Sequence, residues 1–215
     1  MLNFRTLLSR PVGSLLVAAP LATAFLAVKT LPPSSHFRPV RLFSSTGSTA
    51  SDAAVSSLPR RLLDPEGNEL SSEHYSELLS GKRVAYYMAA GWCPMCTSFE
   101  PSLLQFRQAA RDAGKGELAL IYVPSDRSQE AALQRASAFE MLSVPFGDDA
   151  DEIKRQYNIW SGSESLKFGF GRRSGVPALV VLSGETGEEL AFLPAEAQGV
   201  KALQAWPLED DTGVW

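Results

Sequence analysis

Cys93 and Cys96 are the only cysteines in the chain, and only Pro94 and Met95 stand between them. They follow an apolar stretch typical of a buried strand and open an amphipathic segment, so Cys93 is expected at the N-terminus of a helix. Unpaired backbone N–H groups and the positive end of the helix dipole favour a thiolate there and should lower the pKa of Cys93. Cys96 follows after about one turn, so its sulfur can reach that of Cys93.

This spacing predicts a pair that switches between dithiol and disulfide. Cys93 is expected to be exposed and to attack a disulfide in another molecule, and Cys96, shielded by the helix, would then resolve the mixed disulfide. Two simple core thiols would not explain the spacing at a strand–helix junction. A zinc half-site completed by another chain is a further alternative, but His74 is the only other soft ligand in the expected mature domain. We therefore expect a redox pair and no metal.

The segments around the cysteines alternate between apolar strands and amphipathic helices. Phe99, Leu103, Phe106 and Ala110 recur at helical spacing and form one apolar stripe. The expected strands cover residues 61–63, 84–90, 118–123, 178–182 and 189–193, the last two as a hairpin. The expected helices cover residues 72–79, the stretch from the cysteines to about 112, 128–139, 148–157 and 195–206. This order predicts an α/β fold with a mixed central β-sheet flanked by α-helices.

The N-terminal part of the chain differs in composition from the rest. Residues 1–51 carry five basic side chains and no acidic one, which is typical of an organelle transit peptide. We expect an organelle-targeting presequence over residues 1–43, which ends at a mitochondrial processing site after Phe43. The expected location of the protein is therefore the mitochondrial matrix. The apolar run 15–28, with a small-residue cleavage pattern at 22–24, leaves plastid targeting through secretory entry as the alternative.

Three further segments complete the expected organisation. Small polar residues dominate residues 44–57 and predict a flexible linker. The folded domain is expected over residues 58–207, and residues 208–215 are expected as an acidic, solvated C-terminal tail. Beyond residue 51 the chain holds 15 basic and 24 acidic groups, a net charge of −9.

The composition excludes several classes of protein. Hydrophobic residues make up 45% of the 215 residues, which is enough for one core and excludes a mostly disordered chain. No apolar run reaches the ~18–20 residues of a membrane span. An acidic domain without a basic stripe argues against nucleic acid as a partner. Because no glycine-rich nucleotide motif is present, we expect no cofactor beyond the redox-active Cys93–Cys96 disulfide and an upstream protein or small-thiol reductant.

Six short motifs carry a resemblance to a known family. They are Gly81–Val84, Trp92–Cys96, Phe99–Pro101, Ser125–Arg127, Val144–Phe146 and Gly175–Leu182. Together they resemble the thioredoxin-like superfamily, and within it the tryparedoxin and nucleoredoxin branch. The resemblance implies a thioredoxin-like fold and catalytic roles for Cys93 and Cys96, with Trp92, Pro94 and Met95 as supporting residues of the site.

The same resemblance implies a second part of the site around Pro177. It implies a cis bond between Val176 and Pro177 and a turn that packs against the cysteines, where the backbone before the proline binds the substrate peptide. A trans proline that merely starts a strand is the alternative.

The expected function is that of a thiol–disulfide oxidoreductase, acting as a protein-disulfide reductase. The expected partners are disulfide-containing proteins such as peroxidases, and the expected oligomeric state is a monomer. The alternative is a redox-sensing, protein-binding module of the same fold with slow or no turnover. A peroxidase that acts directly on peroxide is disfavoured, because no cysteine has the proline and threonine frame of a peroxidatic cysteine.

Two features depart from the family pattern. Many thioredoxins carry a buried acid six residues before the first cysteine, where this chain has Tyr87; the proton acceptor for Cys96 is therefore open, and Glu100 is a candidate. The second feature is the long stretch between Tyr157 and Pro177. We expect it to border the active site and to bind a partner protein, with Arg172 and Arg173 favouring the Cys93 thiolate; its other candidate contact residues are Phe168 and Phe170. A flexible insertion is the alternative.

Overall fold

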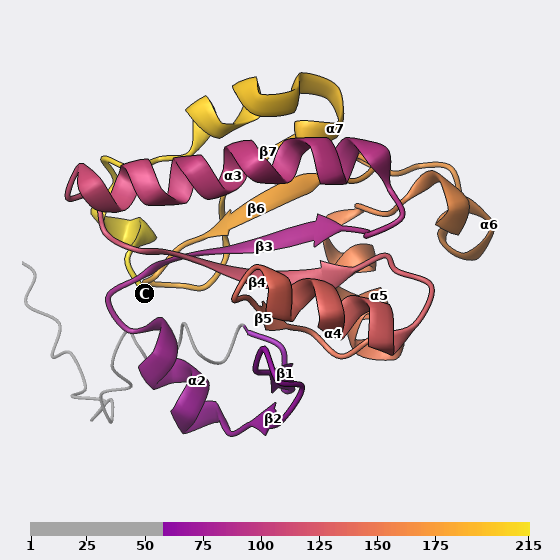
Figure 1. Ribbon diagram of the computed structural model, residues 1–215, viewed down its shortest axis with the longest axis horizontal. Helices are drawn as coiled ribbons and strands as arrows, with labels where there is room; N and C mark the ends of the chain where they lie inside the picture. The colour runs from indigo at the N-terminus through magenta and orange to yellow at the C-terminus, as the bar shows by residue number, and fades with distance from the viewer. Residues whose placement is uncertain (1–57) are drawn as a thin grey trace, which may run out of the picture. The chain divides into compact units, whose positions relative to one another are not determined.

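The computed structural model describes residues 58–215, and the predicted presequence (1–43) and linker (44–57) lie outside them. In this part of the chain one mixed sheet has the strand order β2-β1-β5-β4-β3-β6-β7 (Figure 1). The pairs β3–β4 and β4–β5 are parallel and the other neighbours are antiparallel. The strands are β1 (Leu62–Leu63), β2 (Glu69–Leu70), β3 (Arg83–Ala89), β4 (Leu118–Pro124), β5 (Leu142–Ser143), β6 (Ala178–Leu182) and β7 (Glu189–Leu193).

Helices cover both faces of this sheet, so the predicted α/β architecture is confirmed. Their bounds are α2 (Ser72–Leu79), α3 (Pro94–Asp112), α4 (Gln129–Ala138), α5 (Asp148–Tyr157), α6 (Ser165–Phe168) and α7 (Ala195–Gln198), with 3₁₀ helices η1 (Gly162–Glu164), η2 (Gly199–Ala205) and η3 (Asp211–Gly213). None of the helices within residues 58–215 combines the length and apolar character needed to cross a membrane.

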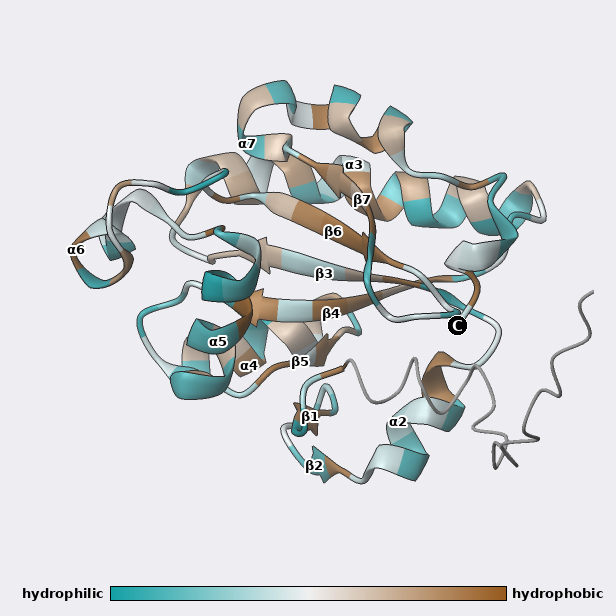
Figure 2. Cartoon of the chain, turned by 180° about the vertical axis from the view of Figure 1, so that it is seen from behind, coloured by the Kyte–Doolittle hydropathy of each residue, from teal (hydrophilic) through white to brown (hydrophobic). Residues whose placement is uncertain are grey.

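The connections β3–α3–β4 and β4–α4–β5 step in the same direction across the sheet. Since such parallel crossovers are right-handed, α3 and α4 lie on the same face. They lie in front of the sheet in Figure 1, whereas α5 is in front in the reverse view of Figure 2. On β3, Tyr87 packs against Phe99 of α3, while Tyr86 packs against Tyr157 of α5. Alternate side chains of this central strand thus face opposite sides of the sheet, and Tyr87 faces the side covered by α3, the helix that begins at the cysteines.

The central strands supply most of the core. Every residue of β3 and β6 is buried, as expected for strands covered on both faces, and Figure 2 shows β4 and β6 as mainly hydrophobic. The strands β2 and β5 were not predicted. Each has only two residues, too few to show an alternating pattern.

Two expectations for the C-terminal region are wrong. The predicted helix over residues 195–206 ends at Gln198 and continues as η2, because Gly199 has a φ of 55°, a left-handed conformation that terminates an α-helix. Residues 208–215 are not a solvated tail. Trp215 exchanges two backbone hydrogen bonds of 2.7 Å with Lys82 and Gly81, and Arg83 donates to the Asp210 carbonyl over 2.6 Å.

Candidate active site

Cys93 caps the N-terminus of α3, directly after the turn that follows β3. Its φ and ψ of −87° and 114° are extended, and the Cys96 backbone N–H donates to Cys93 Sγ over 3.4 Å. This is the geometry of an N-cap, with a sulfur in place of the usual oxygen acceptor. Pro94 lies in the first turn, where its missing N–H leaves no bond unmade. The predicted position of the pair, where a strand passes into a helix, is confirmed.

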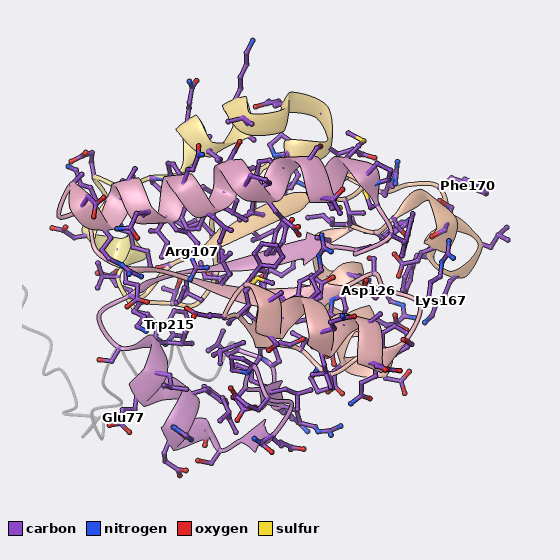
Figure 3. All side chains as sticks on the ribbon, in the orientation of Figure 1. Glu77, Arg107, Asp126, Lys167, Phe170 and Trp215 are labelled. Carbon is purple, nitrogen blue, oxygen red and sulfur yellow. The ribbon has the colours of Figure 1, made fainter. Side chains whose placement is uncertain are left out.

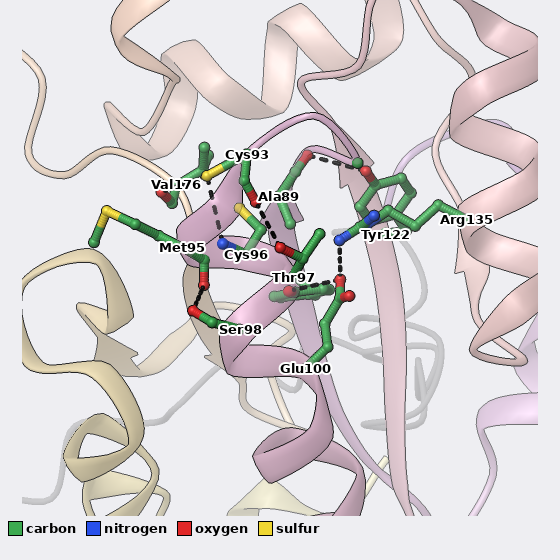
Figure 4. Close-up of polar contacts among 12 residues, drawn as sticks. Ala89, Cys93, Met95, Cys96, Thr97, Ser98, Glu100, Tyr122, Arg135 and Val176 are labelled. Carbon is green, nitrogen blue, oxygen red and sulfur yellow. Dashed lines mark hydrogen bonds and ion pairs between the residues drawn. The ribbon is translucent and has the colours of Figure 1, made fainter.

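The sulfur of Cys93 is more enclosed than the sequence indicated. Cys93 exposes 7% of its surface and Cys96 exposes 0%, and both are free thiols. The Cys93 thiol donates to the Val176 carbonyl over 3.6 Å (Figure 4), so a segment distant in the sequence covers it. The expectation of an exposed Cys93 is therefore wrong for this dithiol state, although Cys96 is the more deeply buried of the two, as expected.

Val176 and Pro177 stand immediately before β6, and the peptide bond between them is cis. Because Ala178 of β6 pairs with Met88 of β3, the residues before β6 lie at the end of β3 that leads to the cysteines. Pairing of these two strands therefore brings the two predicted parts of the site together.

Glu196 of α7 holds the segment that leads to Val176, and sequence analysis missed it. Its Oε2 accepts from the Gly175 N–H over 2.5 Å, and its Oε1 accepts from Arg172 over 3.0 Å. Arg172 also donates to the Trp160 carbonyl over 3.0 Å. No local pattern marks Glu196, because its partners reach it only through the fold.

Contacts with the loop after β4 hold the turn that carries Trp92. Trp92 Nε1 donates to the Ser125 carbonyl over 2.9 Å, and the Gly91 N–H donates to Asp126 Oδ1 over 2.7 Å. The Arg127 guanidinium lies 5.6 Å from the centre of the Trp92 ring. Trp92, Pro94 and Met95 are exposed and form the rim of the site around Cys93.

Comparison with known proteins agrees with this geometry. A family model described as thioredoxin-like matches residues 81–189. The chain belongs to the thioredoxin-like family. It is similar to nucleoredoxin of Mus musculus, at 32% identity over 123 residues, which is 56% of this chain and 24% of that protein. It is also similar to probable nucleoredoxin 1 of Arabidopsis thaliana, at 28% identity over 133 residues, which is 62% of this chain and 20% of that protein.

Among solved structures, the chain is similar to tryparedoxin II from C. fasciculata. The TM-score is 0.51 at 21% identity, and the match covers 71% of this chain and 92% of that one. The resemblance to the tryparedoxin and nucleoredoxin branch is thus confirmed. The chain spans about a quarter or less of the length of the curated nucleoredoxins it matches.

In this thioredoxin-like domain, the core side of Cys96 holds a buried ion pair. The Tyr87 hydroxyl donates to Glu100 Oε1 over 3.2 Å, and Arg135 of α4 pairs with the same oxygen (Figure 4). The side chains of Glu100 and Arg135 expose only 6% and 10% of their surface. The sequence pointed to Tyr87 and Glu100 but missed Arg135, because an arginine on a mostly polar helix carries no local signal.

Burial acts on each titratable group in this cluster. It raises the pKa of Cys96, as does hydrogen bonding with Cys93, whereas the charge of Arg135 opposes the rise. Burial also raises the pKa of Glu100, against the lowering influence of Arg135 and of the Tyr87 hydroxyl. Tyr87 remains a neutral donor, because burial and the neighbouring carboxylate raise its pKa far above the ordinary value.

Residues 158–175 include two short helical turns, η1 and α6. Trp160 is buried, and Phe168 packs on it with ring centroids 5.4 Å apart. Phe170 is exposed and points away from the domain (Figure 3). Of the two aromatic residues predicted to contact a partner, Phe170 is therefore the more exposed, and Phe168 is partly buried.

The two arginines of this segment are paired with carboxylates. Arg172 bonds Glu196, and Arg173 makes two hydrogen bonds of 2.7 and 2.8 Å to Glu189 while lying 3.8 Å from the centre of the Phe192 ring. These carboxylates offset the positive charge that was expected to act on Cys93. An influence of either arginine on the Cys93 thiolate stays a prediction.

Proposed function

We propose that this chain is a thiol–disulfide oxidoreductase, and more narrowly a protein-disulfide reductase that works through Cys93 and Cys96. The observation that carries the proposal is the Cys93 sulfur, which accepts from the Cys96 backbone N–H at the start of α3 and faces the Val176 carbonyl. Unpaired amide groups and the positive end of the helix dipole lie at this position. The family match and the similarity to nucleoredoxin support the same chemistry.

In the first half-reaction, the Cys93 thiolate attacks one sulfur of a substrate disulfide. A bond forms between Cys93 Sγ and that sulfur, the substrate disulfide breaks, and its electron pair leaves on the other substrate sulfur. The Val176 carbonyl, which accepts from the Cys93 thiol in the dithiol state, becomes available to accept from a substrate N–H once Cys93 is ionised or bonded. Val176 would thus help to orient the substrate peptide.

In the second half-reaction, Cys96 attacks Cys93 Sγ and releases the remaining substrate thiolate. The dithiol has then given two electrons to the substrate and has become the Cys93–Cys96 disulfide. The burial of Cys96 restricts its attack to the neighbouring sulfur and keeps it from outside disulfides. An upstream protein or small-thiol reductant restores the dithiol.

We further propose that the substrates are disulfide-containing proteins such as peroxidases and that the chain acts as a monomer. The mitochondrial matrix is the proposed location, with a plastid as the alternative. The location depends on the composition of residues 1–43.

Reduction of insulin disulfides in the presence of a small dithiol tests the proposal. The full chain should accelerate this reduction catalytically, and Cys93→Ser should return the rate to background, because the attacking sulfur is gone. Ser98→Ala, at an exposed position on the same helix, is the control and should keep the rate. Equal activity in Cys93→Ser would refute the assignment of Cys93.

A redox-sensing module with slow turnover is the second candidate, and the enclosure of Cys93 favours it. That candidate predicts stoichiometric oxidation of the pair by a disulfide but no multiple turnover. The insulin assay therefore separates the two functions with the same preparation.

A further inference from the structure

Cys96 must lose a proton before it can resolve a mixed disulfide, and a carboxylate lies one helical turn away. Glu100 follows Cys96 by four residues on α3, so both side chains lie on the same face of the helix (Figure 4). Both residues are buried. Because burial raises the pKa of Cys96, ionisation of this thiol needs a proton acceptor within the protein.

The contacts of Glu100 leave one of its two oxygens available. The Tyr87 hydroxyl and the Arg135 guanidinium both donate to Oε1, and no residue in 58–215 donates a hydrogen bond to Oε2. Arg135 is a cation and Tyr87 is a neutral donor, so neither of them can take up the proton. Glu100 is the member of this cluster with a free lone pair and a negative charge.

Other titratable groups also face this carboxylate. Asp126, in the loop after β4, raises the pKa of Glu100 by charge repulsion, and Tyr122 of β4 donates its hydroxyl to Asp126 Oδ2. Asp126 Oδ1 accepts from the Gly91 N–H. Both oxygens of Asp126 therefore accept hydrogen bonds, whereas Oε2 of Glu100 accepts none from residues 58–215.

We propose that Glu100 accepts the proton of Cys96 in the resolving step, and that Tyr87 and Arg135 are positioning residues that hold the Glu100 carboxylate in the buried cluster, one helical turn along α3 from the thiol. This proposal rests on the proposed function, because it concerns the second half of the same thiol–disulfide exchange.

The proposed step is balanced in protons and electrons. The proton leaves Cys96 Sγ and is taken up at Oε2 of Glu100, which becomes a neutral acid. The thiolate then attacks Cys93 Sγ, the Cys96–Cys93 bond forms, and the bond from Cys93 to the substrate sulfur breaks with its electron pair on the substrate. Arg135 faces a carboxylate before the transfer and a thiolate after it, so its charge is balanced throughout.

A surface cavity of about 440 Å³ lies against the outer side of this cluster. It is lined by Trp92, Asp126, Arg127, Arg135 and Phe139, among others. Arg135 contacts Glu100 on its inner side and lines the cavity on its outer side.

Dithiobis-nitrobenzoate, a small aromatic disulfide, separates the two steps in the full chain. Attack by Cys93 releases one coloured thiolate and resolution by Cys96 releases the second, so rapid-mixing absorbance measures both rates. Glu100→Gln should leave the first release within about twofold and slow the second by about tenfold or more at neutral pH. The difference should disappear at alkaline pH, where hydroxide removes the proton of Cys96.

A purely electrostatic role of Glu100 predicts the opposite result. Glu100→Gln removes a negative charge and leaves Arg135 unpaired, which would lower the pKa of Cys96 and speed up the second release. A second release that is unchanged or faster therefore overturns the proposal. Loss of the first release in the unaltered chain would instead overturn the proposed function, so the two failures are distinguishable. Glu77→Gln, at an exposed site on α2 (Figure 3), is the control.

Tyr87→Phe tests the same step if Glu100→Gln fails to fold, because it keeps the carboxylate and the shape of the ring. The Tyr87 hydroxyl lowers the pKa of Glu100, so its removal raises that pKa and Glu100 becomes protonated at a higher pH. The loss of the second release on acidification should then begin at a higher pH than in the unaltered chain. If the second release is lost at the same pH in Tyr87→Phe and in the unaltered chain, the result contradicts the role of Glu100.

Discussion

The two sides of the cysteine pair differ in the chemical groups that line them. On the Cys93 side, the sulfur meets main-chain atoms, the Cys96 N–H and the Val176 carbonyl, and the rim around it is exposed. On the Cys96 side, the helix face that carries Cys96 also carries Glu100, whose side chain is paired with Arg135, and both of these ionisable side chains are buried. The Cys93 side offers main-chain dipoles, whose partial charges do not change with pH. The Cys96 side offers side chains that can exchange a proton.

This difference separates substrate binding from proton transfer. Main-chain dipoles keep their direction and their partial charges whichever substrate binds. This property suits the Cys93 side, which must accept different disulfide proteins. Burial of ionisable groups shifts their pKa values and keeps substrate away from them, which suits the side that must exchange a proton. Changes on the two sides should therefore affect different steps, and each of the following variants tests that separation.

The largest expected effect is that of Cys96→Ser. Turnover should fall to background, because the mixed disulfide on Cys93 has no sulfur to resolve it, while the first attack continues. Intact-mass measurement after incubation with a disulfide substrate should show a stable adduct on Cys93. Continued turnover, or an unmodified protein, would mean that the two sides do not divide the reaction in this way.

Arg135→Met should destabilise the domain by about 3–5 kcal/mol at neutral pH, because it leaves a buried carboxylate without its cation. Without Arg135 the pKa of Glu100 rises further above its value in the unfolded chain. A raised carboxyl pKa favours the folded state while the group is protonated, so the loss should be small at acidic pH and grow as the pH rises through the folded-state pKa.

Urea unfolding of Arg135→Met at about pH 4 and about pH 7 measures this dependence. Arg60→Met, at an exposed arginine, is the control and should show little change at either pH. A loss of equal size at both pH values would show that Arg135 contributes by packing rather than through Glu100.

Glu196→Ala should act on the other side of the pair and more weakly. It removes the hydrogen bonds to Gly175 and Arg172, so stability should fall by about 1–2 kcal/mol. The Val176 carbonyl would be less well placed, and the KM for a protein disulfide should rise about threefold while the resolution rate stays constant. A slower second release of the aromatic thiolate would show that the two sides are coupled.

Arg173→Gln should have the smallest effect. The pair with Glu189 is partly exposed, and such pairs contribute about 0.2–1 kcal/mol. Thermal unfolding should therefore change little, and both release rates should stay constant. A slower first release in this variant alone would support the prediction that Arg173 promotes the Cys93 thiolate.

Much of the fold could be predicted because its signals are local. The apolar runs at β3, β4 and β6 and the helical stripe of α3 lie within single segments of the sequence, and the structure confirms them. The two-residue strands β2 and β5 are too short for any such signal. The end of α7 depended on the backbone conformation of Gly199, and the packing of residues 208–215 depended on Lys82 and Arg83 far earlier in the chain.

In the candidate site too, the sequence indicated the features that depend on neighbouring residues but not the contacts between distant segments. The sequence indicated Cys93, Cys96, Trp92 and Pro177 from their spacing and their place between elements. It did not indicate the enclosure of Cys93, which comes from a carbonyl 83 residues away, or the pairing of Glu100 with an arginine 35 residues away. These contacts form only when β6 pairs with β3 and α4 packs beside α3.

The sequence by itself determined the element types and the place of the cysteines at a helix N-terminus, because hydrophobic periodicity and helix geometry act over a few residues. The tertiary structure alone decided which groups surround each sulfur and how their pKa values shift. Burial and charge pairing depend on residues distant in the chain, and no local pattern encodes them.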